Sequence, residues 1–320
     1  MRFLKMLLVA LFVAAIGLYY FVYVTTPQAT AYFIRYERDA AKLTRKDVVL
    51  PDGMHYFYLE GGHGEPLVLL HGFGGDKDHF IRIAKFLTPH YHVIIPDLLG
   101  FGESSHPTNV DMSARVDYTS RAQAERVRAL VQSLGLKSVH LGGNSMGGQI
   151  ALAYAAAHPS EVESLWLLSP AGIWSAPQSE LEKIVEGQQR NILFIRNVDD
   201  FNHAYDFVMS KPPLIPRPIL NVLAQNSIIN EKLSEQIFTE ITNDSVEKRV
   251  TGLKTPALIV WGNQDRVLNH LTAELLYKLM PKSRVVIMNG IGHMPMLESP
   301  EQCAEDYLYF RFKLQVPEVN

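Results

Sequence analysis

Apolar residues along this chain alternate between short continuous runs and longer stretches in which they recur every three or four positions. From about residue 47, the runs in "PLVLLHG", "YHVIIPD", "VHLGGN", "LWLLSP", "ALIVWG" and "RVVIMN" predict buried strands, and the stretches between them predict amphipathic helices. Strands that alternate with helices are typical of a mostly parallel sheet. We therefore expect an α/β fold with a mostly parallel central sheet flanked by helices.

Residues 171–250 break this alternation. They contain helical patterns such as "QSELEKIVEGQQRNILF" and "INEKLSEQIFTEIT", and "KPPLIPRPI" between them carries four prolines. Proline lacks a backbone N–H and disrupts helices, so this segment should bend the chain instead of forming a helix. We expect a helical cap over 171–250, inserted between two parts of a core at 47–170 and 251–320.

The N-terminus has a different pattern, because residues 6–24 are uniformly apolar and carry no charge. A helix of this length nearly spans a hydrocarbon layer of about 30 Å, and Tyr19, Tyr20 and Tyr23 suit its interface with water. We expect a transmembrane anchor within residues 1–26. The alternative is a cleaved signal peptide, for which Ala29-Thr30-Ala31 fits the cleavage site, although the apolar stretch is longer than usual.

Residues 27–46 follow the span and predict an amphipathic helix with Tyr32, Tyr36 and Leu43 on one stripe. Such a helix either lies on the membrane surface or is a solvated linker. Ala10, Ala14 and Gly17 place small residues along the span, where a second copy could pack to form a homodimer.

Two features of the flanking charges favour opposite orientations at the cell (inner) membrane. Arg2 and Lys5 precede the span as in a signal sequence, which favours an extracytoplasmic (periplasmic) catalytic domain. The positive-inside rule, counted over both flanks, favours the reverse. That count includes five basic residues after the span: Arg35, Arg38, Lys42, Arg45 and Lys46.

Composition narrows the function classes. A chain of 320 residues with 47% hydrophobic residues can bury a large core, and a net charge of −3 gives no electrostatic reason to expect nucleic acid as a partner. The single cysteine, Cys303, excludes an internal disulfide, and the twelve histidines form no pair with metal-ligand spacing. We expect neither a metal nor another cofactor.

The stretch "HLGGNSMGGQIA", residues 140–151, places four glycines around Ser145. The flanking patterns predict a strand before the serine and a helix after it. Gly143 and Gly147 complete the pattern Gly-x-Ser-x-Gly, which is typical of a nucleophile elbow, a strained turn that exposes the serine hydroxyl. Ser145 is therefore a candidate nucleophile.

Two candidate partners follow later strands. Asp265 comes after "ALIVWGNQ" and His293 after "VVIMNGIG", in the chain order serine, acid, histidine. A serine hydroxyl needs an imidazole to take its proton, and the imidazole needs a carboxylate to fix its tautomer. Since ligands bind at the carboxyl ends of parallel strands, we expect Ser145, His293 and Asp265 to meet there as a catalytic triad.

An oxyanion hole requires two backbone N–H groups. Met146 should supply one from the start of the helix, and Phe73 the other from the loop "HGFGG". Gly72 lets that loop approach closely, and His71 is expected to organise the loop and not to act as a second base.

With these motifs the chain resembles the α/β-hydrolase superfamily across nearly everything after residue 47. Within it, the N-terminal span and the cap resemble membrane-anchored monoacylglycerol lipases and related bacterial lipases and phospholipases A. The resemblance implies hydrolysis of lipid esters without a cofactor. It rests on five motifs: His71-Gly72-Phe73-Gly74, Asp97-Leu98-Leu99-Gly100-Phe101-Gly102-Glu103-Ser104, Gly143-Asn144-Ser145-Met146-Gly147-Gly148, Trp261-Gly262-Asn263-Gln264-Asp265 and Gly292-His293.

Three functions remain open from the sequence. The leading one is a membrane-anchored serine hydrolase that cleaves phospholipid, lysophospholipid or monoacylglycerol esters through an acyl-enzyme. The second is a carbon–carbon bond or small-ester hydrolase, because "GNSMGG" also resembles the elbow of enzymes that cleave ring-fission products. In those enzymes a tryptophan commonly follows the catalytic histidine, whereas Met294 follows His293 here. The third is a non-enzymatic receptor on the same fold.

Overall fold

An eight-stranded sheet runs through the fold in the order β1-β2-β4-β3-β5-β6-β7-β8. The computed structural model describes residues 2–107, 116–188, 191–228 and 231–315. Strand β2 is antiparallel to β1 and β4, and all other neighbouring strands are parallel. The expected mostly parallel α/β sheet is confirmed. The strands are β1 (Leu43–Val49), β2 (His55–Gly62), β3 (Glu65–Leu70), β4 (Tyr91–Pro96), β5 (Val139–Asn144), β6 (Val162–Leu168), β7 (Ala257–Gly262) and β8 (Ser283–Met288).

The sheet is covered on both faces because its central strands are apolar on both sides. Along β3, Val68 and Leu70 belong to one core cluster, and Leu67 and Leu69 belong to the other. Burial of each such side chain stabilises the folded state by about 1.5–3 kcal/mol, so apolar packing holds a layer of helices on each face of the sheet. The first cluster includes residues of α4 (Ser120–Ser133), α5 (Met146–Ala157), α10 (Glu247–Val250) and α11 (Thr272–Leu279); the second includes residues of α3 (Ile81–Leu87), α12 (Pro295–Glu298) and α13 (Pro300–Gln315). Two short 3₁₀ helices, η1 (Lys77–Phe80) and η2 (Pro159–Glu161), complete the core.

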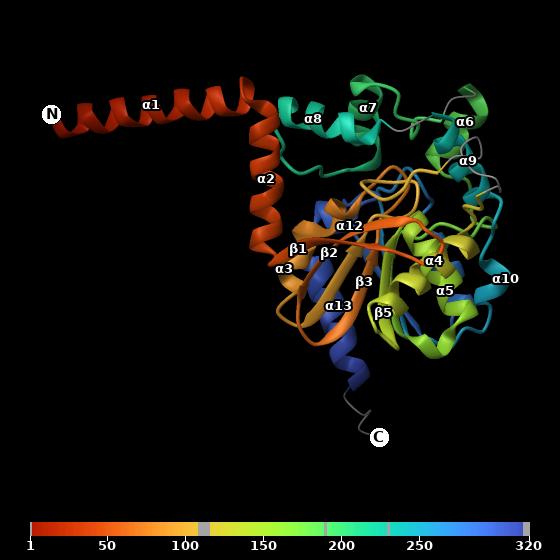
Figure 1. The fold of residues 1–320 in the computed structure, drawn as a ribbon. Coiled ribbons are helices and arrows are strands. Elements are labelled where there is room, and N and C mark those ends of the chain that lie inside the picture. The colour runs from red at the N-terminus through yellow and green to blue at the C-terminus, as the bar shows by residue number, and fades with distance from the viewer. Residues whose placement is uncertain (1, 108–115, 189–190, 229–230, 316–320) are drawn as a thin grey trace.

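Five helices come between β6 and β7, and all of them except α10 gather at one end of the molecule, away from the C-terminus (Figure 1). The helices at this end are α6 (Glu180–Gln188), α7 (Val198–Val208), α8 (Arg217–Ser227) and α9 (Glu231–Thr242). Residues 211–216 form no helix, as their prolines predict. Helix α8 is not expected from the pattern, and it forms because Pro218 falls in its first turn, where proline is tolerated.

Helix α1 (Arg2–Tyr23) projects away from the body of the protein, and α2 (Thr26–Ala40) turns sharply from its base and runs along the fold (Figure 1). Along α1 only Val22 is buried, and the helix is long and apolar enough to cross a membrane. Helix α2 contacts α3, α8 and β1.

The structure differs from the expected helix over 27–46. The helix ends at Ala40, and residues 43–49 form the edge strand β1. Lys42 adopts a left-handed φ of 53°, which ends the helix, and Leu43 is buried and pairs with Gly61 of β2. The helical periodicity of the sequence continues past Ala40 by chance, but pairing with β2 makes residues 43–49 a strand.

Candidate active site

Ser145 lies at the turn between β5 and α5, in a backbone conformation that residues other than glycine rarely adopt. Its φ is 54° and its ψ is −117°. A Cβ at Gly143 would overlap the backbone of Gly147, and a Cβ at Gly147 would overlap the carbonyl oxygens of Leu70 and His71. The strain costs about 1–3 kcal/mol, and the close packing of the two glycines maintains it.

Asp265 and His293 are joined by a hydrogen bond of 2.7 Å from Nδ1 of His293 to Oδ2 of Asp265. The Asp265 carboxylate is fully buried and also accepts hydrogen bonds from Trp261 Nε1 and from the backbone N–H groups of Val267 and Leu268. A carboxylate only accepts, so Nδ1 of His293 carries a hydrogen and Nε2 is left free to accept one. Both Ser145 and His293 line the same cavity.

The loop after β3 and the start of α5 meet beside Ser145. A Cβ at Gly72 would come within 3.3 Å of Cβ of Ser145, so only glycine allows this approach without displacement. Met146 begins α5, and Phe73 lies in the loop. In the described part of the chain, neither backbone N–H has a hydrogen-bond acceptor, which leaves both available to a ligand oxygen.

Both ring nitrogens of His71 are occupied within this loop. Nδ1 donates to the carbonyl of Gly72 at 2.8 Å, and Nε2 accepts from the backbone N–H of Leu98 at 3.0 Å. Complete burial lowers the pKa of His71 from 6.5 to about 4. The ring is therefore neutral in the folded protein and has no nitrogen left to accept a proton from serine.

This burial predicts a pH-dependent stability. Between pH 6.5 and about 4 the unfolded chain binds a proton at His71 that the folded chain does not, so the free energy of unfolding falls as the pH falls through this window. Chemical unfolding in detergent should show that the free energy of unfolding falls between pH about 7 and 4.5 in both proteins. The fall should be about 2 kcal/mol smaller for His71→Gln than for the wild type. Glutamine can donate and accept like His71 but does not titrate. Equal losses in the two proteins would contradict the assignment.

Sequence patterns did not identify two residues that hold His293 in place. Asn144 Nδ2 donates to the backbone carbonyls of Leu168 and His293, both at 3.0 Å. Glu298 accepts from the N–H groups on both sides of His293, at Gly292 and Met294. The same carboxylate accepts from Ser210 and Lys211, and therefore ties the histidine loop to the segment after α7. The position of Asn144 beside the serine was the only available signal.

A buried ion pair holds the loop that carries Phe73. Nζ of Lys77 donates to Asp97 at 2.6 Å, and Asp97 also accepts from the backbone N–H groups of Lys77 and Glu103. Burial opposes the charge on Lys77, but Asp97 and Glu103 together outweigh burial and raise the pKa of the lysine. The motif that begins at Asp97 therefore has a structural role. Through Lys77, its first residue fixes the loop that carries Phe73.

Ser145 and His293 open into a cavity of about 360 Å³ that extends under the cap to α2. Most of its wall is apolar and comes from α2, α7, α8 and residues 213–216. The apolar lining includes Phe33, Ile34, Phe201, Ala204, Leu214, Ile215, Ile219, Leu220 and Leu223. This wall suits a hydrocarbon chain whose carbonyl lies at Ser145.

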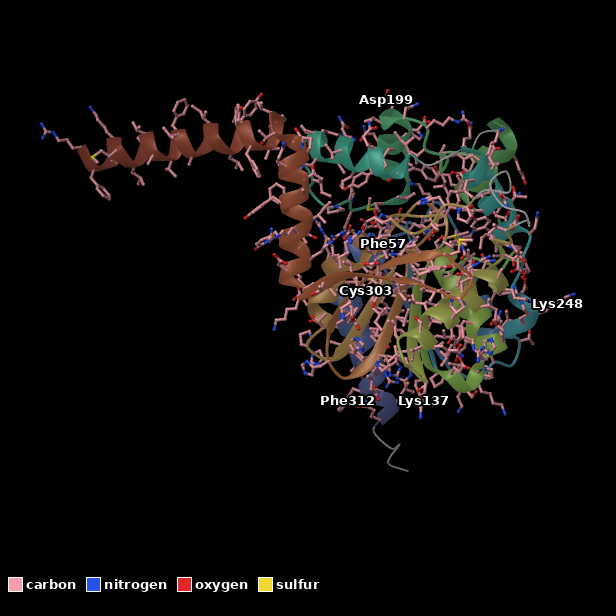
Figure 2. The ribbon with its side chains drawn as sticks, in the orientation of Figure 1. Phe57, Lys137, Asp199, Lys248, Cys303 and Phe312 are labelled. Carbon is pink, nitrogen blue, oxygen red and sulfur yellow. The ribbon has the colours of Figure 1, made fainter. Side chains whose placement is uncertain are left out.

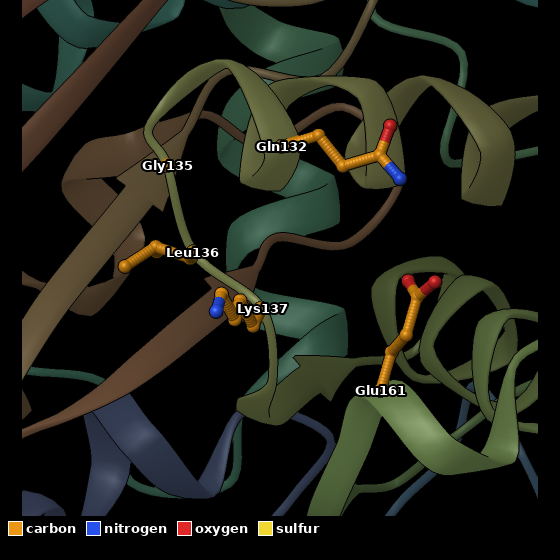
Figure 3. Close-up of a pocket in the computed structure, with 5 residues that line it drawn as sticks. All are labelled: Gln132, Gly135, Leu136, Lys137 and Glu161. Carbon is orange, nitrogen blue, oxygen red and sulfur yellow. The ribbon is translucent and has the colours of Figure 1, made fainter.

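A second hollow lies beside Lys137, at the end of the fold away from the cap (Figure 2), and Figure 3 shows it in close-up. It is lined by Gln132, Gly135, Leu136, Lys137 and Glu161, and Glu161 is paired with Arg128. It contains no nucleophile, so it is not the candidate active site. Among the described residues, no group of three or more His, Cys, Asp or Glu could hold a metal ion.

The chain as a whole is similar to known proteins. A model of the alpha/beta hydrolase fold matches residues 65–300. Lipase 1 of Psychrobacter immobilis is 46% identical over 294 residues, covering 89% of this chain and 90% of that protein. Monoacylglycerol lipase ABHD6 of Homo sapiens is 29% identical over 256 residues, covering 76% of this chain and 74% of that protein. The crystal structure of a membrane phospholipase A, a bacterial virulence factor, matches with a TM-score of 0.85 and 37% identity, covering 98% of this chain and 99% of that one. The chain belongs to the α/β-hydrolase fold family.

Proposed function

We propose that this protein is a membrane-anchored serine hydrolase that cleaves carboxylic esters of lipids through an acyl-enzyme. The cavity carries the proposal, because it joins Ser145 and His293 to a long apolar wall under the cap. Relatives that are named lipases and a structural neighbour named a phospholipase A support the same class of substrate.

The geometry supplies the steps of acyl transfer. Oγ of Ser145 attacks the ester carbonyl while Nε2 of His293 takes its proton, and Asp265 stabilises the imidazolium. The N–H groups of Phe73 and Met146 bind the negative oxygen. The imidazolium then protonates the leaving alcohol. Water, deprotonated by His293, attacks the acyl-serine and releases the carboxylic acid.

The N-terminal helices give the site access to a bilayer. Helix α1 serves as a single-pass anchor, and the chain turns at its base so that α2 forms part of the cavity wall. Leu214 lies at the same cavity and its side chain is fully exposed to solvent. These positions let an acyl chain pass from the membrane surface into the cavity. We place the catalytic domain outside the cytoplasm and the stripe of Ala10, Ala14 and Gly17 at a contact between two copies.

Removal of residues 2–21 tests the anchor. Because residues 2–20 are exposed and Phe21 is half-buried, the truncated protein should stay folded and hydrolyse a short soluble ester at close to the full-length rate. Its rate on lipid embedded in vesicles should fall by about tenfold or more, since about 20 apolar residues supply the membrane affinity. Both proteins should be assayed on liposomes and on the soluble ester.

An equal rate on liposomes for the two proteins would contradict the anchoring role. Failure of the full-length protein to hydrolyse any lipid ester would overturn the proposed function. The association state of both proteins in detergent tests the dimer, which should dissociate when residues 2–21 are removed.

A further inference from the structure

The Trp261 side chain contacts the candidate triad from the end of β7 without belonging to it. Its Nε1–H donates to Oδ2 of Asp265 at 2.9 Å, and Nδ1–H of His293 donates to the same oxygen at 2.7 Å. The indole is fully buried, and the Asp265 carboxylate has no access to solvent. Trp261 and His293 therefore share one carboxylate oxygen in a site that is closed to water.

The main chain fixes the positions of the two donors. Gly262 follows Trp261, and a Cβ at this position would overlap the carbonyl oxygens of Ile291 and Gly292. The backbone N–H of Gln264 also donates to the carbonyl of Ile291 at 2.9 Å. The end of β7 and the histidine loop are therefore in direct backbone contact, which holds the indole, the carboxylate and the imidazole together.

Burial alone does not require an indole N–H of this protein to be paired. The chain has three tryptophans, and in the other two, Trp166 and Trp174, Nε1 is buried with no hydrogen-bond partner among the described residues. Trp166 is also fully buried, in β6, and its ring stacks on Tyr307. The hydrogen bond of Trp261 is therefore a specific contact of the triad.

The charge of Asp265 is shared among four donors. Oδ1 accepts from the backbone N–H groups of Val267 and Leu268, and Oδ2 accepts from Trp261 and His293. A hydrogen bond from a neutral donor stabilises the carboxylate and weakens its attraction for another proton donor. The two backbone donors act on Oδ1, whereas Trp261 acts on the oxygen that His293 uses.

We propose that Trp261 is a positioning residue for the triad, which holds Oδ2 of Asp265 and moderates the attraction of that oxygen for the imidazolium of His293. With the indole N–H in place, His293 can act as a base at a lower pH than it could beside the carboxylate alone. This inference rests on the triad of the proposed function and does not depend on the identity of the ester.

Other charged or titratable groups share the environment of His293. Glu298 of α12 accepts hydrogen bonds from the backbone N–H groups on both sides of the histidine. Six further side chains line the same cavity, from α2, the segment after the oxyanion loop, α3 and α7: Glu37, Asp76, Asp78, His79, Arg82 and Tyr205. A substitution of Trp261 leaves all of these groups in the protein, so the comparison with wild type isolates the contact to Asp265.

The test measures how fast a fluorophosphonate probe labels the full-length protein in detergent, from pH about 5 to 9. The probe reacts with an activated serine, so the rate should rise with pH as His293 becomes a neutral base. Trp261→Phe should move the half-maximal pH upward by about half a unit, because the lost hydrogen bond acts on the imidazole only through the carboxylate. Trp166→Phe, at an equally buried tryptophan whose N–H is unpaired in the described structure, is the matched control and should keep the wild-type midpoint. The midpoint does not depend on the fraction of folded protein.

A second protein keeps the shape of the indole, and it decides the question if Trp261→Phe does not fold. All three tryptophans are replaced by an analogue with sulfur in place of the indole N–H. Among the described residues this exchange removes one tryptophan hydrogen bond, from Trp261 to Asp265, so the midpoint should rise by the same half unit. An unchanged midpoint in the analogue protein overturns the inference, whatever Trp261→Phe does. A wild type that is labelled but hydrolyses no lipid ester overturns the proposed substrate alone, and a wild type that is not labelled overturns both proposals.

Discussion

Ser145→Ala should abolish ester hydrolysis, with a loss in kcat of about 10⁶ as for other serine nucleophiles in triads. The substitution removes the hydroxyl oxygen that we propose forms the acyl-enzyme, and it leaves His293 bound to Asp265. It also removes labelling by a fluorophosphonate probe, which reacts with an activated serine. The measurements are turnover of a soluble ester and covalent labelling of the purified full-length protein.

The matched control is Ser160→Ala, an exposed serine in η2 at the far end of α5. It should keep both turnover and labelling. The Ser145→Ala protein should unfold at the wild-type temperature or slightly above it, because alanine at this strained position replaces a side chain of similar size. Undiminished labelling of Ser145→Ala would show that another residue is the nucleophile.

The nucleophile elbow could be predicted from the sequence because the residues that determine it are neighbours along the chain. Gly143 and Gly147 flank Ser145 within five residues, and the apolar run before them and the alanine-rich run after them define a strand and a helix. Asp265 and His293 could be proposed because parallel strands bring their carboxyl ends to one edge. The prediction needed only the order of the strands and no side-chain contact.

Long-range contacts explain what the sequence did not reveal. The end of α2 depends on pairing between Leu43 and Gly61, which no local pattern contains. Glu298 acts through backbone N–H groups of two separate loops, so its role has no residue signature.

Asp265→Asn should lower kcat/KM by about 10⁴ while leaving Ser145 in place. Oδ1 accepts from two backbone N–H groups, at Val267 and Leu268, so the amide oxygen of asparagine will occupy that position. The amide nitrogen then replaces Oδ2 and faces Nδ1 of His293. It donates to Nδ1 and forces the ring hydrogen onto Nε2, which can no longer accept the serine proton.

The same exchange leaves the N–H of Trp261 facing a second donor, and an unsatisfied buried group of this kind costs about 1–3 kcal/mol of stability. Kinetics should therefore be measured well below the unfolding temperature of the variant, with Asp199→Asn, exposed on the cap (Figure 2), as the control. Fluorophosphonate labelling should persist at a much lower rate, because the nucleophile remains and only its base is in the wrong tautomer. A variant within about tenfold of wild type would show that Asp265 does not set the tautomer of His293, and that another carboxylate or the backbone orients the base.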